Sequence, residues 1–139
     1  ALGAFLILEQ ANPRIFVHED DTKYIASNFG EALVKVIEGD VIDTAIGTFE
    51  VYLTPGHTNG SMCLYNADKK ILISGDTVFP DGNYGRYDGE SGSLDAMINS
   101  LKKLTELDCE IMLPGHGSPV FQDANSHIQL SHTQASRPR

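Results

Sequence analysis

The sequence predicts a mixed α/β (α+β) domain built in layers, and three observations support this prediction. Short runs of β-forming residues occur early and in the middle of the chain, a clear amphipathic helix follows them, and one more strand and helix complete the pattern. Strands and helices, then a β meander, then helix–strand–helix is typical of a layered α/β fold. The 139 residues have the size of one domain and can bury a core, and no linker or repeat divides them.

The amino-terminal third is predicted to alternate short helices and strands. Asn12-Pro13 would end a first helix, because proline cannot continue one. An aspartate near Asp20 would cap a second helix, and Gly30 would end it. The elements expected here are a helix over residues 2–10, a strand over 14–18, a helix over 20–28, and strands over 33–37 and 41–45.

The middle of the chain gives the clearest β signal. Three runs rich in β-forming residues are expected to be strands, over residues 48–53, 61–66 and 71–74. The short polar turn Ala67-Asp68-Lys69-Lys70 separates the last two runs and predicts an antiparallel hairpin.

The last third is predicted to be a loop followed by helix, strand and helix. Residues 79–92 form a long polar loop, which in a compact domain is typical of a functional segment. Ser93 is a helix cap, and a leucine-rich stripe from Leu94 to Leu107 has the helical spacing of a core-packing face. A strand over residues 110–113, a helix over 124–132 and a frayed tail at 137–139 complete the list.

Composition excludes several classes of function. A net charge of −9 argues against nucleic acid or an anionic membrane as the main partner, because long-range repulsion opposes their approach. No apolar run approaches the roughly 20 residues that a membrane-spanning helix needs, and the apolar start lacks the pattern of a signal peptide. Cys63 and Cys109 lack metal or redox spacing and are interpreted as small buried hydrophobes rather than a disulfide, which predicts a cytoplasmic protein.

Three glycine-containing turns each follow a predicted strand and present one metal-binding side chain. Alone, each turn has an ordinary explanation as a solvated loop or an Asx turn, but three in one small domain favour a shared site. Two imidazoles and a carboxylate meeting there would suit zinc, and neighbouring Thr58, Thr77 and Ser118 are expected to hydrogen-bond the ligands. The turns are Thr54-Pro55-Gly56-His57-Thr58, Ser74-Gly75-Asp76-Thr77 and Pro114-Gly115-His116-Gly117.

In this order the three turns resemble the later motifs of the metallo-β-lactamase superfamily, the αββα sandwich hydrolases. The match extends from about residue 53 to residue 118 and implies a partial αββα sandwich. The resemblance assigns His57 to a first metal, Asp76 to a bridge between two metals, and His116 to the second metal. An aspartate at position 76, where one group of true β-lactamases has cysteine, resembles the glyoxalase-like branch.

The chain departs from this family near its start. Relatives carry a His-x-His-x-Asp-His motif, but His18 is the one histidine before His57, and Val17-His18-Glu19-Asp20 is not that motif. We therefore expect residues 1–139 to be a single incomplete domain, the carboxyl-side portion of a longer hydrolase. With three ligands, this portion alone is expected to have little hydrolase activity.

For the complete enzyme, the resemblance implies metal-assisted hydrolysis of an ester, thioester, lactone or similar bond in a small molecule. One or two zinc ions, with iron as the alternative, would lower the pKa of bound water to about 7 and polarise the scissile bond. Asp76 would bridge the ions and orient the attacking oxygen. Two other interpretations stay open: an iron-dependent oxidoreductase similar to sulfur dioxygenases, and a non-catalytic half-fold that binds a partner chain, such as a second copy, through its uncovered sheet.

The long loop supplies the substrate-binding candidates Tyr84, Arg86 and Tyr87. The segment Gly85-Arg86-Tyr87-Asp88 resembles a Gly-Arg-x-Asp element that is common after the bridging aspartate of the superfamily. Arg86 either pairs with Asp88 or reaches toward the site, and the tyrosines either line a pocket or cover the core. The remaining histidines are not expected to bind metal; the spacing of His127 and His132 predicts that both face solvent.

Overall fold

The computed structural model describes residues 11–139, apart from the side chains of residues 26–28. The helix predicted for residues 2–10 lies outside the described residues. Every other predicted helix and strand is present, with ends shifted by a few residues at most. The strands are β1 (Ile15–His18), β2 (Leu33–Val36), β3 (Val41–Thr44), β4 (Gly47–Leu53), β5 (Met62–Asn66), β6 (Ile71–Gly75) and β7 (Ile111–Pro114), the α-helices are α2 (Thr22–Phe29), α3 (Leu94–Thr105) and α4 (Ala124–Ala135), and the 3₁₀ turns are η1 (Glu19–Asp21), η2 (Gly30–Ala32) and η3 (Pro80–Gly82).

Five strands form the main sheet, in the order β3-β4-β5-β6-β7. Neighbours from β3 to β6 are antiparallel, and the pairing of Leu64 with Ile73 confirms the predicted β5–β6 hairpin. Strands β6 and β7 are parallel, and their last residues, Gly75 and Pro114, are partners in the register. Parallel strands end at the same edge of a sheet, so the segments that follow β6 and β7 begin next to each other.

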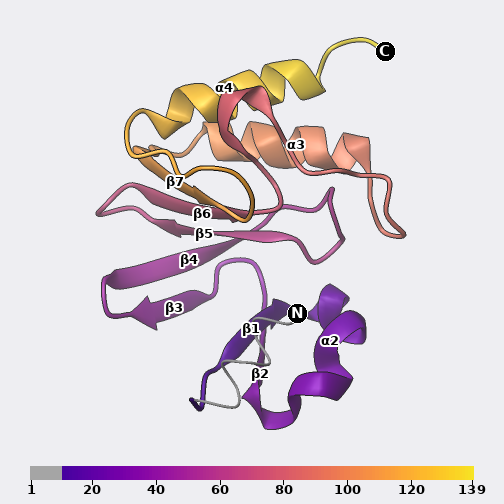
Figure 1. Ribbon diagram of the computed structural model, residues 1–139, viewed down its shortest axis with the longest axis vertical. Coiled ribbons are helices and arrows are strands. Elements are labelled where there is room, and N and C mark those ends of the chain that lie inside the picture. Colours follow the sequence, from indigo (N-terminus) through magenta and orange to yellow (C-terminus); the bar gives the residue numbers. More distant parts are fainter. Residues whose placement is uncertain (1–10) are drawn as a thin grey trace.

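Helices α3 and α4 lie side by side on one face of this sheet (Figure 1). The predicted stripe on α3 is confirmed, because Met97, Leu101 and Leu104 are completely buried. Ser93 caps the helix as predicted, since its hydroxyl accepts a hydrogen bond from the Ala96 N–H at 3.2 Å. The main core comprises Cys63, Tyr65, Leu72, Val78, Met97, Leu101, Leu104, Cys109, Met112, Ala124, Ile128 and Ala135.

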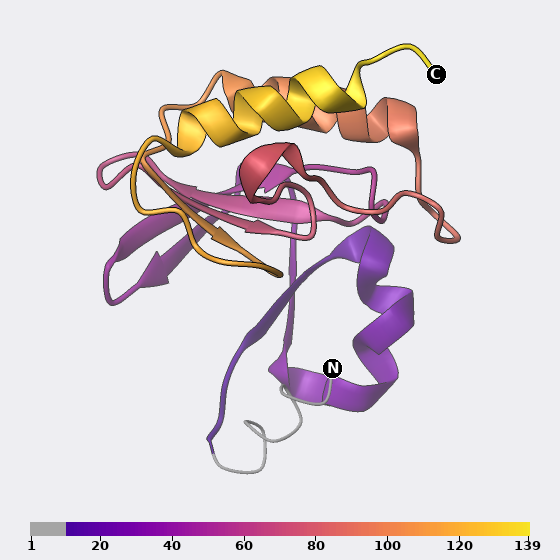
Figure 2. The same cartoon turned by 45° about the horizontal axis from the view of Figure 1, so that its top comes forward.

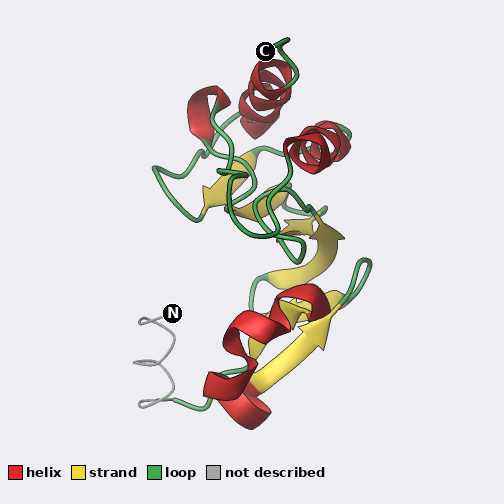
Figure 3. Ribbon diagram, turned by 90° about the vertical axis from the view of Figure 1, so that its right-hand side faces the viewer, coloured by secondary structure: helices red, strands yellow, loops and turns green. Residues whose placement is uncertain are grey.

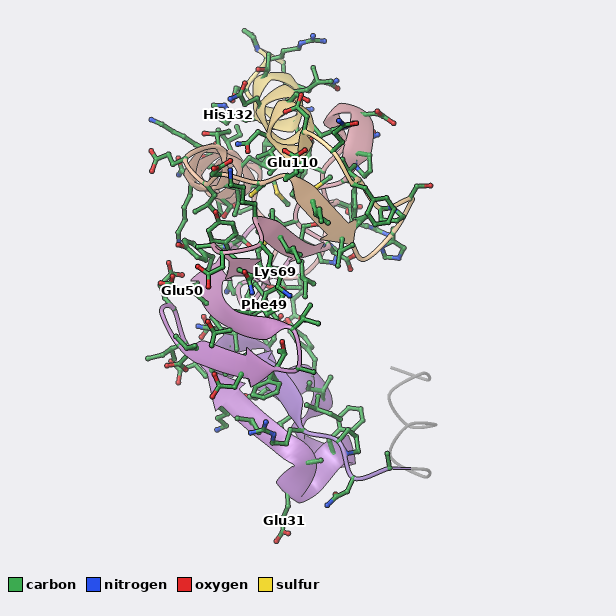
Figure 4. All side chains as sticks on the ribbon, turned by 90° about the vertical axis from the view of Figure 1, so that its left-hand side faces the viewer. Glu31, Phe49, Glu50, Lys69, Glu110 and His132 are labelled. Carbon is green, nitrogen blue, oxygen red and sulfur yellow. The ribbon has the colours of Figure 1, made fainter. Side chains whose placement is uncertain are left out.

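A smaller unit made of β1, β2 and α2 lies on the other side of the main sheet (Figure 2). Its two strands are parallel to each other and form a separate sheet. A second core cluster, built from the buried side chains of Val36, Ile42 and Val51, joins β2 to β3 and β4. The helices, the main sheet and the small unit therefore follow one another along the molecule, with α2 beside the small sheet (Figure 3). Glu31 lies near one end and His132 of α4 near the other (Figure 4).

Three local predictions were wrong. Asp21 occupies the N-cap position of α2, but its carboxylate makes no capping hydrogen bond to that helix. The side chain of His127 is only 27% exposed, and its Nδ1 accepts a hydrogen bond from the Asp81 N–H at 3.0 Å, which ties α4 to η3. The tail is not simply frayed, since Arg139 donates to the hydroxyl of Tyr84 at 2.9 Å.

The two cysteines are buried and free, as predicted. Burial, which disfavours the charged thiolate, raises the pKa of Cys63 to about 11 and that of Cys109 to about 12. Among the residues that the structure describes, no helix combines the length and the apolar character that a membrane crossing requires.

Candidate metal centre

The three predicted ligands converge at one edge of the main sheet. His57 lies in the segment between β4 and β5, Asp76 directly follows β6, and His116 lies two residues after β7. The Nδ1 atom of His116 lies 2.8 Å from Oδ1 of Asp76, and Nε2 of His57 lies 3.7 Å from Oδ2 of the same carboxylate. The exposed fractions of the three side chains are 29% for His57, 36% for Asp76 and 76% for His116, so solvent reaches the group.

Two glycines allow the backbone to come close to Asp76. The N–H of Gly115 donates to the Gly75 carbonyl at 2.8 Å, and a Cβ at position 115 would lie 2.6 Å from Oδ1 of Asp76. A Cβ at Gly85 would lie only 1.8 Å from the carbonyl oxygen of Asp76. Only glycine can occupy these two positions without moving the backbone, so both turns depend on it.

The backbone next to Gly85 also orients the ring of His57. Its Nδ1 lies 2.7 Å from the carbonyl oxygen of Arg86. A carbonyl oxygen only accepts hydrogen bonds, so Nδ1 must carry the proton and donate it. The Nε2 atom, which faces Asp76, is then the nitrogen available to a metal in the neutral ring. A backbone carbonyl that orients a ligating histidine is a common feature of metal sites.

The threonines beside the ligands do not bind them, which corrects the prediction. Thr77 is fully buried, and its hydroxyl lies 2.8 Å from that of Thr54, which in turn contacts the Cys63 sulfur at 3.4 Å. Thr58 donates instead to a carboxylate oxygen of Asp21 at 2.6 Å. These hydroxyls hold the loops that carry the ligands, while the backbone of Arg86 holds His57.

Asp21 is a site-supporting residue that the sequence did not reveal. One carboxylate oxygen accepts from Thr58, and the other accepts from the N–H of Gly60 at 3.0 Å. The start of α2 is thereby bound to the loop that carries His57. An aspartate at a helix start normally indicates a cap, so nothing in the sequence indicated this long-range contact.

A cavity of about 270 Å³ lies between the three predicted ligands. The ring of Phe79 stands edge-on to that of His116, with centroids 5.9 Å apart. The six lining residues are His57, Asp76, Phe79, Gly85, Arg86 and His116.

The chain matches the family model of the metallo-beta-lactamase superfamily over residues 1–116. This match spans most of the chain and includes all three converging residues. The chain belongs to the metallo-β-lactamase superfamily. The predicted family and its α/β fold are thereby confirmed.

Relatives and solved structures agree with this assignment. Human acyl-coenzyme A thioesterase MBLAC2 is 36% identical over 102 residues, which cover 66% of this chain and 35% of that protein. Hydroxyacylglutathione hydrolase GloC of Haemophilus influenzae is 35% identical over 83 residues, which cover 58% of this chain and 39% of that protein. The crystal structure of TTHA1623 in a di-iron-bound form superposes with a TM-score of 0.70 at 26% identity, over 85% of this chain and 64% of that one. The chain thus spans well under half the length of these two curated relatives.

Within this metallo-β-lactamase fold, the donor set suits a divalent transition metal. Imidazole nitrogens and a carboxylate are the usual ligands of zinc and of non-haem iron, and the Nδ1–H bond of His57 leaves its Nε2 directed at Asp76. Across residues 11–139, however, no three histidine, cysteine or acidic side chains are spaced around one common point. His116 and Asp76 instead hydrogen-bond directly, so a metal held by both would replace that bond. Metal binding at this centre stays a prediction.

The three predicted substrate-binding residues, all in the loop of residues 79–92, have different neighbours. Arg86 forms a two-pronged pair with Asp88, at 2.8 and 3.0 Å, which lowers the pKa of Asp88 and raises that of Arg86. Arg86 also borders the central cavity. Tyr84 packs against the main core, and the guanidinium of Arg139 lies 5.7 Å from the ring centroid of Tyr87. A role in substrate binding stays a prediction for all three.

Proposed function

We propose that the protein containing this chain is a metal-dependent hydrolase that cleaves a thioester or a related ester or lactone bond with water. The observation that carries this proposal is the convergence of His57 and His116 on the carboxylate of Asp76, inside one cavity. Zinc, or iron, would supply Lewis acidity when bound, lowering the pKa of water and polarising the scissile carbonyl.

The residues of this chain would hold and orient the reacting groups. His57 would offer Nε2, because the carbonyl of Arg86 holds its other nitrogen. His116 and Asp76 would complete the donors from this chain, and the free lone pairs of Asp76 can accept a hydrogen bond from the attacking water and orient it. Among the described residues that line the cavity, none is a serine or cysteine nucleophile, so water is the attacking group that the geometry favours.

Thioesters are the first substrate class to test. The two named relatives are an acyl-coenzyme A thioesterase and a hydroxyacylglutathione hydrolase, and both kinds of substrate join an acyl group to sulfur. A hydroxide that attacks such a carbonyl expels a thiolate, which takes up a proton from solvent. A small-molecule substrate and a cytoplasmic location remain part of the proposal, and the two free thiols fit a reducing compartment.

The experiment uses the protein as its gene encodes it, with metal content measured by mass spectrometry and hydrolysis measured on thioester, ester and lactone panels. Replacing His57, Asp76 or His116 with alanine should remove bound metal and lower kcat/KM by at least about a hundredfold. His132→Ala, on α4 and outside the cavity lining, is the matched control and should change neither quantity. Full turnover by His116→Ala, or by protein stripped with a chelator, would contradict the proposal.

A second candidate is iron-dependent oxidation of a sulfur compound on the same scaffold. The di-iron form of TTHA1623 favours iron as a candidate metal. Oxygen uptake that depends on iron and on a thiol substrate, without hydrolysis of any ester in the panel, would favour this candidate. The third candidate is a non-catalytic dimer. A mass of twice that of one chain, measured by light scattering on metal-free protein, together with no turnover by metal-loaded protein, would favour it.

A further inference from the structure

A second cavity of about 340 Å³ adjoins the central one on the α2 side. It lies between α2 and the loop that leads into α3, segments that approach each other in Figures 1 and 2. The two cavities share His57 and Arg86, so a molecule bound at the centre can extend into the second space. Its lining comprises Tyr24, His57, Thr58, Arg86, Gly89, Glu90 and Ser91.

The charged groups around this second cavity are paired with one another. The ammonium of Lys23 lies 3.8 Å from a carboxylate oxygen of Glu90 and 4.8 Å from the centroid of the Tyr24 ring. Arg86 is held by Asp88 in the two-pronged pair described above. Both cations beside the cavity therefore already have a carboxylate partner, and the chain carries a net charge of −9. This environment disfavours an anionic ligand group.

The remaining wall is suited to an uncharged group. The hydroxyl of Thr58 donates to Asp21, and the hydroxyl of Ser91 accepts from the Asn59 N–H at 3.2 Å, so both are engaged within the protein. Tyr24 is 43% exposed and is the aromatic residue among the described residues that line this cavity. Aromatic surface of this kind binds partly apolar ligand groups.

We propose that this second cavity is a substrate subsite that holds an uncharged, partly apolar arm of the thioester, with Tyr24 as its specificity-determining residue. The inference rests on the proposed function, because the shared residues His57 and Arg86 connect the subsite to the reacting centre. Either the acyl group or the thiol portion can supply such an arm. The test below separates these two sources.

The binding test uses an uncharged, non-hydrolysable probe, S-butyl-N-acetylcysteamine. These 139 residues contain no tryptophan, so Tyr24→Trp places their single tryptophan in the subsite. We expect its emission to shift in a saturable way on titration with the probe. Ile46→Trp, at a similarly exposed position in the β3–β4 turn, is the control and should not respond. A probe whose N-acyl group ends in a carboxylate should bind Tyr24→Trp at least threefold more weakly.

The kinetic test compares Tyr24→Ala with Tyr24→Phe and Ile46→Ala in the protein as its gene encodes it. Loss of the ring should raise KM about tenfold for uncharged thioesters, with kcat within twofold of the unsubstituted protein. Tyr24→Phe keeps the ring and should keep KM, and Ile46→Ala should change neither constant. Two substrate series, one with a longer acyl group and one with a longer thiol portion, identify the arm that occupies the subsite. In the series whose added length contacts the ring of Tyr24, KM should fall with length in the unsubstituted protein but not in Tyr24→Ala.

The outcomes separate the two proposals. No emission change up to millimolar probe, together with unchanged KM in Tyr24→Ala, overturns the subsite even when the protein is an active thioesterase. Tighter binding of the carboxylate-bearing probe overturns it as well. A saturable emission change in a protein that hydrolyses no thioester, ester or lactone supports an uncharged-ligand subsite and overturns the proposed function instead.

Discussion

Replacing Thr54 with valine is expected to lower the free energy of unfolding by about 2 kcal/mol. Thr54 and Thr77 are both completely buried, and their hydroxyl oxygens lie 2.8 Å apart. Valine in place of Thr54 removes the oxygen partner of the Thr77 hydroxyl and leaves it only the Cys63 thiol, a weak hydrogen-bonding group. A buried polar group that loses its partner costs about 1–3 kcal/mol. Because the two hydroxyls join the loops of His57 and Asp76, the same pair also holds the candidate centre together.

Thr77→Val should cost about as much. The hydroxyl of Thr54 then likewise keeps only the Cys63 sulfur, at 3.4 Å, so we again expect a loss of about 2 kcal/mol. The double variant removes both hydroxyls from the core and should cost at least about 1 kcal/mol less than the sum of the two single losses, since replacing both partners with apolar groups is nearly neutral.

Urea denaturation, followed by circular dichroism, measures the free energy of unfolding of the two single variants and the double variant. Each kcal/mol should also appear as a shift of about 3 °C in Tm for a chain of this length. Thr48→Val, on an exposed position of β4, is the matched control and should stay within about 0.5 kcal/mol of the unsubstituted protein. Strict additivity of the two single losses would refute the reasoning, because it would mean that the two hydroxyls do not interact.

Three further predictions follow from the same structure. Gly85→Ala should destabilise the fold by at least about 2 kcal/mol in urea denaturation and weaken zinc binding in competition titrations, since its Cβ would lie 1.8 Å from the Asp76 carbonyl oxygen. Gly89→Ala is its control, because a Cβ there meets nothing within 4 Å. The folded state keeps the Cys63 proton up to a pKa of about 11, whereas the unfolded thiol loses it near 9. Stability should therefore be fully present below pH 9 and fall by roughly 3 kcal/mol as the pH rises toward 11, with a smaller slope in Cys63→Ala in pH-dependent denaturation. Asp21→Ala should reduce zinc affinity about tenfold by releasing the loop of His57, with partial recovery in Asp21→Asn.

Each of these three has an outcome that would contradict it. Gly85→Ala with the stability and zinc affinity of Gly89→Ala would show that the loop can move away from Asp76 without cost. Equal pH slopes in the unsubstituted protein and in Cys63→Ala would show that this thiol is not protected. Unchanged zinc affinity in Asp21→Ala would show that His57 is held without the contact to α2.

The described secondary structure was predictable because its signals are local. The apolar stripe of α3 and the cap at Ser93 depend on residues within one or two helical turns. Three strand ends followed by glycine turns also indicated which side chains are offered to a shared site. The pairing of β1 with β2 in a separate sheet was not predictable, since pairing joins segments that are distant in sequence.

The supporting contacts of the candidate centre were hidden for a physical reason. The carbonyl of Arg86 holds His57, but every residue has a carbonyl, so its use leaves no mark in the sequence. Asp21 at the start of a helix has the appearance of a cap and instead binds a loop nearly forty residues away. Thr58 and Thr77 stand beside the ligands in sequence, yet their hydroxyls turn to other partners.

The sequence by itself determined the order and type of the elements, the residues at the three strand ends, and the family to which they belong. These properties depend on side-chain pattern and on neighbours along the chain. Only the tertiary structure decided that β6 and β7 run parallel and so bring Asp76 and His116 to within 2.8 Å, and that Nδ1 of His57 bonds the loop at residue 86. Such geometry depends on strand direction and backbone path, because a hydrogen bond forms only where distant segments meet at the correct distance and angle.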